Sequence, residues 1–357
     1  MAFDPIQEDC LRLILDHMRE KQVFPLENAT FIEHDMELYT QDASRLIRTD
    51  EQRSFHLVAR AAELMDYKLP FITDEAEAAR VDDEAVAMVR EACELDPKNW
   101  DAYRMAVALD AQSNDDYLRF LIDNSDKVEE DLAARITGAS DPYEREFIRD
   151  LAHRPYLRWL ATIASQALIV GKYGLSLHVA RQMLELDPAD IADVRHTAML
   201  AMAKLECGRD ELATFAREHT PSHSVMVLTG RRRPGAKPKP DPWELIAELS
   251  LAYREMDYDG ATYAIRKLLG GFSHAAEALF YQTEFPEGLF SRINVEPGSD
   301  DELVVALSEA TPLFQEGMGS PDATCFSVWV SNHELVRAAL EDQVSRAVAT
   351  GGTEGGN

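Results

Sequence analysis

The sequence predicts an all-α protein in which helices hold at least half of the residues, and three observations support this. Apolar residues recur at helical spacing, for example over 160–168 and 261–268. Three segments begin with the same helix-start chemistry. Alternating strand patterns are scarce, and the two short candidates, 224–229 and 326–330, have no hairpin partner joined by a tight turn.

The three helix starts lie at Asp4, Asp141 and Asp241. Each Asp is followed directly by Pro, and the third residue after each Asp is Gln or Glu. An Asp at the N-cap accepts hydrogen bonds from backbone N–H groups that the first turn leaves without partners. Pro at the first helical position gives up only a donor that had no partner. The Gln or Glu completes a capping box, so a helix is expected to begin at each of these prolines.

The composition excludes several classes of partner. The chain has 357 residues, 46% of them hydrophobic, which is enough for one large or several ordinary cored domains. It carries 36 Lys and Arg against 64 Asp and Glu, a formal net charge of −28. Phosphate and anionic lipid contacts need Lys and Arg. We therefore expect no nucleic-acid partner and no membrane partner.

The sequence also favours a cytoplasmic location. Its first residues are acidic where a secretory signal would be basic and then apolar. The most apolar stretch, 159–170, is too short for a membrane span and is expected to be a buried helix. Four widely separated cysteines without metal-ligand or disulfide spacing fit free thiols in a reducing compartment: Cys10, Cys93, Cys207 and Cys325.

One segment breaks the helical pattern. Residues 231–240 hold five positive charges, no acid and three prolines, which forbid a helix. This composition predicts a solvated, basic linker. The alternative is a contact for an acidic surface, which could belong to the same chain.

Two segments resemble each other: each ends in Glu-Leu-Asp-Pro, at Pro97 and at Pro188, and each is followed by another apolar helix. The first carries small apolar residues at Ala85, Val89 and Ala92. The pattern resembles the tetratricopeptide repeat, a helix-turn-helix unit of 34 residues. The resemblance covers about a third of the chain and implies hairpins stacked as a curved solenoid, with non-repeat helical flanks.

The resemblance and the composition together give a domain scheme. It places an N-terminal helical region at 1–84, tetratricopeptide-like hairpins at 85–220, and the basic Pro-rich linker at 221–240. A C-terminal helical region with one further hairpin follows at 241–350, and a flexible tail ends the chain at 351–357.

The same resemblance implies a partner-binding face, because the first helix of each repeat lines the concave side. Counted from the two Leu-Asp-Pro turns, this face carries an Arg at the same position of both helices, with small or soft apolar residues nearby. The expected partner-binding residues are Asp101, Arg104, Ala108, Arg195, Met199 and Met202. Arg can grip a carboxylate with two hydrogen bonds, and Met offers an adaptable apolar floor. The alternative is that both arginines neutralise nearby acids.

No motif in the sequence carries enzymatic chemistry. Nucleophile, phosphate-loop and dinucleotide-binding patterns are missing. His219 and His223 have ligand spacing, but Pro221 between them opposes a helix that would present both. We therefore expect no catalytic residue, no metal and no cofactor.

The favoured function is a non-enzymatic scaffold or adaptor that binds a protein or peptide. The alternatives are an acidic decoy or inhibitor of a basic partner, and an enzyme with an unrecognised helical site.

Overall fold

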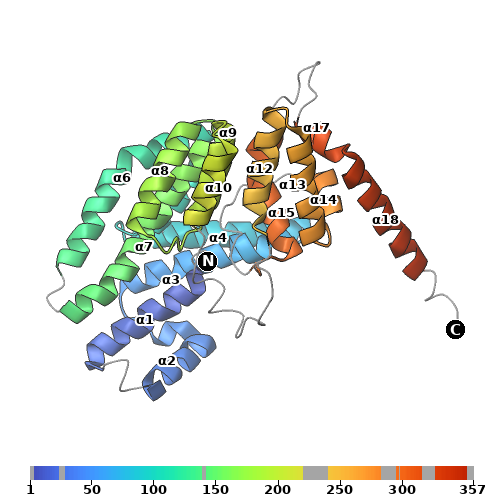
Figure 1. The fold of residues 1–357 in the computed structure, drawn as a ribbon. Helices are drawn as coiled ribbons and strands as arrows, with labels where there is room; N and C mark the ends of the chain where they lie inside the picture. The colour runs from blue at the N-terminus through green and yellow to red at the C-terminus, as the bar shows by residue number, and fades with distance from the viewer. Residues whose placement is uncertain are drawn as a thin grey trace, which may run out of the picture. The chain divides into compact units, whose positions relative to one another are not determined.

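The computed structural model describes residues 4–23, 29–138, 142–219, 240–282, 295–296, 298–315 and 326–351. All regular structure in these ranges is helical and no strand occurs in them, which confirms the all-α prediction (Figure 1). The alternating segment 326–330 is part of a helix. The other strand candidate, the basic segment up to residue 239, and the tail from residue 352 lie outside the described ranges.

The chain divides into two compact units, an N-terminal unit of residues 2–163 and a C-terminal unit of residues 164–357. The division falls inside helix α7 (Pro142–Ile169). It differs from the expected scheme, in which 85–220 formed one region. The expected boundary after residue 84 falls within a single helix, α4.

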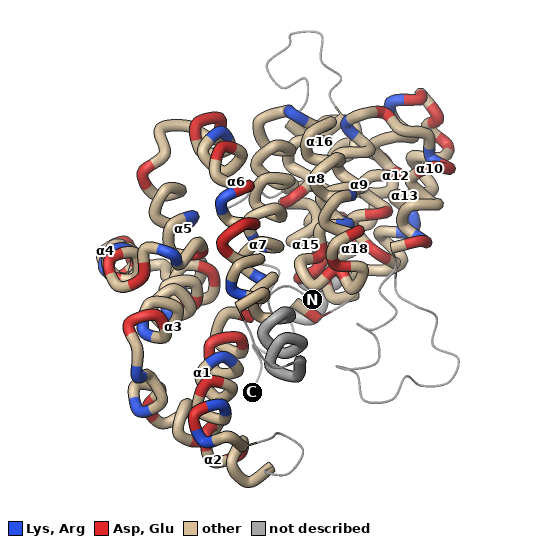
Figure 2. Tube along the Cα trace, turned by 90° about the vertical axis from the view of Figure 1, so that its left-hand side faces the viewer, with Lys and Arg blue, Asp and Glu red and all other residues tan. Residues whose placement is uncertain are grey.

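The N-terminal unit packs its helices largely in chain order, α3 against α4, α4 against α5, and α1 against α3. Its other elements before α7 are α1 (Pro5–Lys21), α2 (Ala29–Asp42), η2 (Ala43–Arg45), α3 (Asp50–Ala62), η3 (Glu63–Lys68), η4 (Leu69–Phe71), α4 (Glu75–Leu95), α5 (Trp100–Asp110) and α6 (Asn114–Thr137). Acidic residues recur along these helices (Figure 2).

The C-terminal unit holds, after the end of α7, the elements α8 (Tyr173–Leu186), α9 (Val194–Lys204), α10 (Arg209–Glu218), α12 (Pro242–Arg254), α13 (Tyr258–Gly271), α14 (Ala275–Tyr281), α15 (Asp300–Glu309), α16 (Thr311–Phe314), α17 (Phe326–Ser331) and α18 (Glu334–Gly351). Helix α9 packs against α8, α10 and α12, and α12 packs against α10 and α13.

The predicted helix starts are confirmed at Pro5, Pro142 and Pro242, where α1, α7 and α12 begin. Asp4 accepts hydrogen bonds from two backbone N–H groups of α1, and Asp241 accepts one from α12. The positions at which α1 and α12 begin therefore follow from residues that are adjacent in the sequence.

The predicted apolar faces are also confirmed. Ala85, Val89 and Ala92 of α4 are fully buried, as are Ala261 and Ala264 of α13. The α4 face packs against α3 and η3, and this contact forms part of the core of the N-terminal unit. Burial of such faces supplies most of the stabilisation of helices too short to persist alone.

Three helices of the C-terminal unit end in the same turn, at Gly171, Glu206 and Met256, each with positive φ. In every case the N–H of this residue donates to the carbonyl three residues before it. The N–H of the next residue donates to the carbonyl five residues before it. This hydrogen-bond pair is the Schellman motif, and it returns the chain into α8, α10 and α13.

Candidate functional site

The first group of expected partner-binding residues lies on α5. Asp101 and Arg104 are buried, with 2% and 3% of their surface exposed, and Ala108 is exposed. Arg104 Nη2 lies 3.6 Å from Asp101 Oδ1, and Asp101 also accepts hydrogen bonds from Arg158 of α7. The side chains of Asp101 and Arg104 therefore form ion pairs inside the N-terminal unit.

The second group lies on α9 of the other unit. Met199 and Met202 are fully buried because α9 is enclosed by α8, α10 and α12. Arg195 donates to Asp190 Oδ2 at 3.0 Å and to Asp193 Oδ1 at 2.6 Å. Both predicted arginines thus pair with nearby acids, as the alternative interpretation expected. Four of the six predicted residues, Asp101, Arg104, Met199 and Met202, are not presented to solvent in this structure.

The resemblance and the structure make opposite predictions for the double variant Arg104→Ala, Arg195→Ala. A partner-binding role predicts lost binding with an unchanged melting temperature. Because both arginines neutralise buried carboxylates, we expect a loss of about 2 kcal/mol or more in the free energy of unfolding. Urea denaturation measures it, with Arg181→Ala, which removes an exposed ion pair, as the control. A double variant as stable as this control would contradict the structural role of the two arginines.

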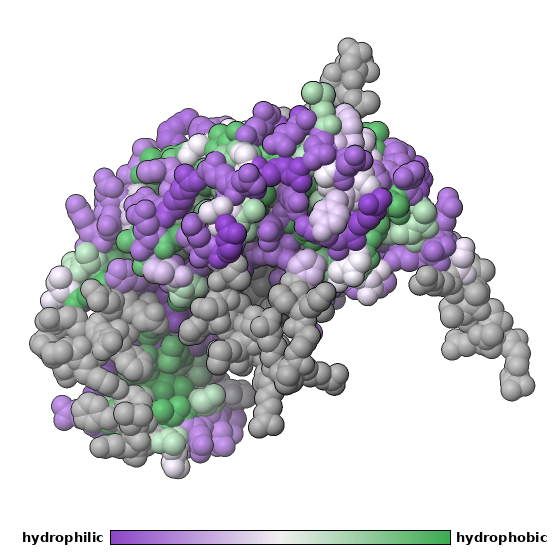
Figure 3. All heavy atoms as spheres, in the orientation of Figure 1, coloured by the Kyte–Doolittle hydropathy of each residue, from purple (hydrophilic) through white to green (hydrophobic). Residues whose placement is uncertain are grey.

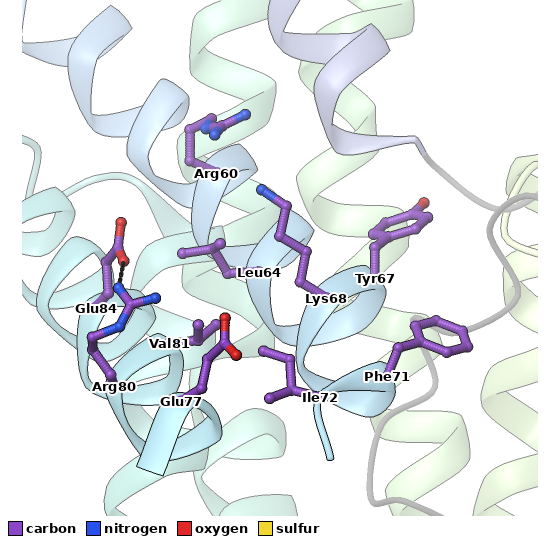
Figure 4. Close-up of a pocket in the computed structure, with 10 residues that line it drawn as sticks. All are labelled: Arg60, Leu64, Tyr67, Lys68, Phe71, Ile72, Glu77, Arg80, Val81 and Glu84. Carbon is purple, nitrogen blue, oxygen red and sulfur yellow. Dashed lines mark ion pairs between the residues drawn. The ribbon is translucent and has the colours of Figure 1, made fainter. Parts of the chain in front are cut away.

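The described surface offers another candidate, a groove of about 540 Å³ in the N-terminal unit (Figure 4). It lies between η3 and η4 on one side and α4 on the other, with the end of α3 above it. Apolar side chains form its floor and charged side chains its rim. Its lining residues are Arg60, Leu64, Tyr67, Lys68, Phe71, Ile72, Glu77, Arg80, Val81 and Glu84.

An irregular helical segment creates this groove. Helix α3 continues into the π-helical turn η3 at Glu63–Lys68, and the 3₁₀ turn η4 follows at once with Pro70 at its second residue. A π turn adds a residue per turn and occurs often at functional sites. Leu64 and Val81 are buried and anchor the floor to the core of the unit. The groove is therefore built into the packing of α3 and α4.

Charged residues surround the apolar floor. Lys68 Nζ lies 3.8 Å from Glu63, which also pairs with Arg60. Across the groove, Arg80 lies 3.6 Å from Glu84. All three cations are at least 40% exposed, so water screens these pairs strongly. The charged groups of these three side chains can therefore leave their present carboxylate partners and bind a ligand with little loss of free energy.

Two aromatic side chains lie at one end of the groove. Phe71 is 81% exposed, the most exposed large hydrophobic residue described. The Tyr67 hydroxyl is buried and has no hydrogen-bond partner within the described residues. Burial, reinforced by the charges of Asp4 and Asp66, raises the pKa of Tyr67, so the hydroxyl remains a donor. A ligand carbonyl or carboxylate could satisfy it.

Asp66 on the same π turn is the most unusual ionisable group near the groove. Burial raises its pKa to about 7, although the positive charge of Arg104 opposes this rise. Its Oδ2 atom is buried without a hydrogen-bond partner in the described structure. The turn therefore contains a carboxyl that changes charge near neutral pH.

Sequence reasoning missed this groove. The signal that could have indicated it is the run Leu69-Pro70-Phe71, where a proline interrupts the pattern between two apolar helices. A proline predicts a helix end, but it does not predict a π turn before that end. The exposure of Phe71 also depends on which neighbours cover it.

Two further expectations concern sites and spans. Within the described residues, no three His, Cys, Asp or Glu side chains are grouped to hold a metal ion, and Cys10, Cys93 and Cys207 are free. Cys325 lies outside those residues. None of the helices in the described part of the chain has the length and apolar character needed to cross a bilayer.

Comparison of the chain with protein-family models, with curated proteins and with solved structures gave no match.

Proposed function

We propose that the protein is a non-enzymatic interaction scaffold. Its C-terminal unit is built from tetratricopeptide-like hairpins, and its groove between η3 and α4 binds a segment of a protein partner.

The repeated turns support the hairpin architecture. The turns at Gly171 and Glu206 are 35 residues apart, close to the 34 residues of the repeat. The interval from Glu206 to Met256 is 50 residues and includes the basic segment 231–240. An insertion between two hairpins accounts for the longer interval.

The packing order gives further support. In a stack of hairpins, each first helix contacts the second helix of its own unit and the next first helix. Helix α9 packs against α10 and α12, and α12 packs against α10 and α13, which fits this scheme. Ser176 of α8 donates to the carbonyl of Ala164 in α7 at 2.7 Å, which joins the preceding pair.

The exposure of Phe71 is the observation that carries the binding function. The hydrophobic residues on the visible face lie mostly in small patches among hydrophilic ones (Figure 3). Phe71, by contrast, lies at one end of the groove, whose apolar floor is formed by Leu64, Ile72 and Val81. Exposed apolar surface next to a groove is typical of interaction sites. An apolar partner side chain in the groove would cover the floor and contact the Phe71 ring.

Site-specific crosslinking tests this function. A benzophenone analogue of phenylalanine at position 71 is expected to crosslink a defined partner in the native cell. The same analogue at Tyr281, which is 67% exposed in the C-terminal unit, is the matched control. The crosslink at position 71 should disappear when the exposed rim residues are changed by Lys68→Glu and Arg80→Glu, which leave the core of the unit intact. Equal crosslinking at both positions, or persistence after these changes, would exclude the groove as the binding site.

A further inference from the structure

A second site lies in the C-terminal unit, where the turn between α17 and α18 meets α12 and α13. A cavity of about 420 Å³ opens there, lined by Val328, Trp329, Asn332, His333 and Glu334. The Trp329 ring is half-buried, and its centre lies 5.2 Å from that of Tyr253 and 5.9 Å from that of Tyr258. The His333 ring meets it edge-on at 4.9 Å. These rings form one aromatic cluster beside the cavity.

The aromatic surface extends beyond the cavity. Tyr258 is 50% exposed and Val328 is 48% exposed. Met256, on the turn that leads into α13, is 74% exposed. This surface is larger than a small cation needs and suits an extended chain that crosses the cavity.

One acidic side chain of the cavity lining, Glu334, favours a cation. Glu334 is exposed at its rim. Residues 241–357 carry 6 basic and 20 acidic side chains, a net charge of −14. Aromatic faces attract cations, and a nearby carboxylate strengthens that attraction. The cavity therefore combines the two features that recognise Lys and Arg.

Two basic side chains beside the cavity, Arg337 and His333, have other partners within the described residues. Arg337 donates to Asn332 Oδ1 at 2.9 Å and lies over the Phe280 ring. His333 Nδ1 accepts the N–H of Leu335 at 3.3 Å, and its other ring nitrogen is 3.1 Å from Thr262 Oγ1. Burial and the charge of Arg266 lower the pKa of His333, although Glu334 opposes this, so the imidazole is neutral at pH 7.

We propose that this cavity binds a Lys or Arg side chain from a basic, proline-containing segment of a partner protein. The cation lies against Trp329 with Glu334 as its counter-ion. The neighbouring prolines pack on Tyr258 and Val328, because extended proline-containing segments dock in aromatic-lined grooves. This site shares no residue with the groove of the N-terminal unit, so either proposal can fail without the other.

Peptide titration tests the proposal with the full chain. The probe is a fluorescein-labelled peptide, Pro-Lys-Pro-Arg-Pro-Lys-Pro, and the control peptide has Gln in place of Lys and Arg. Fluorescence anisotropy should show binding of the first peptide only. Glu334→Gln and Tyr258→Ala should each weaken it about fivefold.

Two matched variants separate the site from general charge attraction. Glu277→Gln removes the same charge from an exposed position of the same unit. Tyr103→Ala removes a similarly exposed ring from the N-terminal unit. Each should change the affinity less than about twofold. Equal effects of Glu334→Gln and Glu277→Gln would overturn the proposal.

A further variant replaces the five basic residues of 231–239 with serine. Tighter peptide binding by this variant that Glu334→Gln abolishes would show that the chain's own segment competes for the site, which would also overturn the proposal.

Discussion

Replacing Arg158 with alanine is expected to destabilise the N-terminal unit by about 3–5 kcal/mol. Arg158 donates through Nε and Nη2 to both oxygens of Asp101, at 2.8 and 2.5 Å, and through Nη1 to Glu8 at 2.7 Å. Both carboxylates are almost fully buried. Arg12 would still bind Glu8, and Arg104 would remain 3.6 Å from Asp101. Neither replaces the guanidinium that bridges the two acids, so buried negative charge would lose its main partner.

Urea denaturation at pH 7 measures this loss, and Arg119→Ala is the control. Arg119 pairs with Asp116 at 3.1 Å on the surface, and its removal should cost less than about 0.5 kcal/mol. Equal stability of the two variants would contradict a structural role for Arg158.

Burial alone would raise the pKa of Asp101, but Arg158 lowers it to about 2. The contribution of the pair is thus complete above pH 4 and declines toward pH 2, so the two curves should converge in acid.

Asp66→Asn is expected to stabilise the protein at pH 8 by about 1–4 kcal/mol. The folded state holds the proton of Asp66 up to about pH 7, because burial raises the pKa of this carboxyl from 3.8. The unfolded chain releases it near pH 4. Stability therefore falls as the pH rises from about 4 to about 7, and the penalty is complete above pH 7. Asn removes the charge and the penalty, so the gain should vanish near pH 4.

Denaturation midpoints measured between pH 4 and pH 8 test this difference. Asp110→Asn is the control, since Asp110 is 71% exposed and pairs with Arg90 on the surface. Its effect should stay below about 0.5 kcal/mol at each pH of this series, as for other exposed ion pairs. Destabilisation by Asp66→Asn at pH 8 would mean that the carboxylate is ionised and stabilised by Arg104, contrary to this prediction.

The local structure of the helices follows from residues that are close together in the sequence. The starts of α1 and α12 follow from an Asp-Pro pair whose carboxylate accepts the N–H groups of the adjacent turn. The apolar faces around Ala85 and Ala261 follow from residue spacing along one helix. These features need only neighbours within about one turn, so a single sequence contains the information that specifies them.

Whether a charged or methionine side chain is buried in the core or exposed on the surface depends on tertiary packing. Residue spacing shows on which face of its helix Met199 or Arg104 lies, but it does not show which neighbouring helix covers that face. Both side chains are buried in the structure. Arg158 joins Asp101, 57 residues away, and Glu8, 150 residues away, and no local pattern records such pairs. The groove beside Phe71 likewise depends on a π turn held by packing against α4. Long-range packing sets the burial, and burial determines whether a charge stabilises the core or is exposed to a partner.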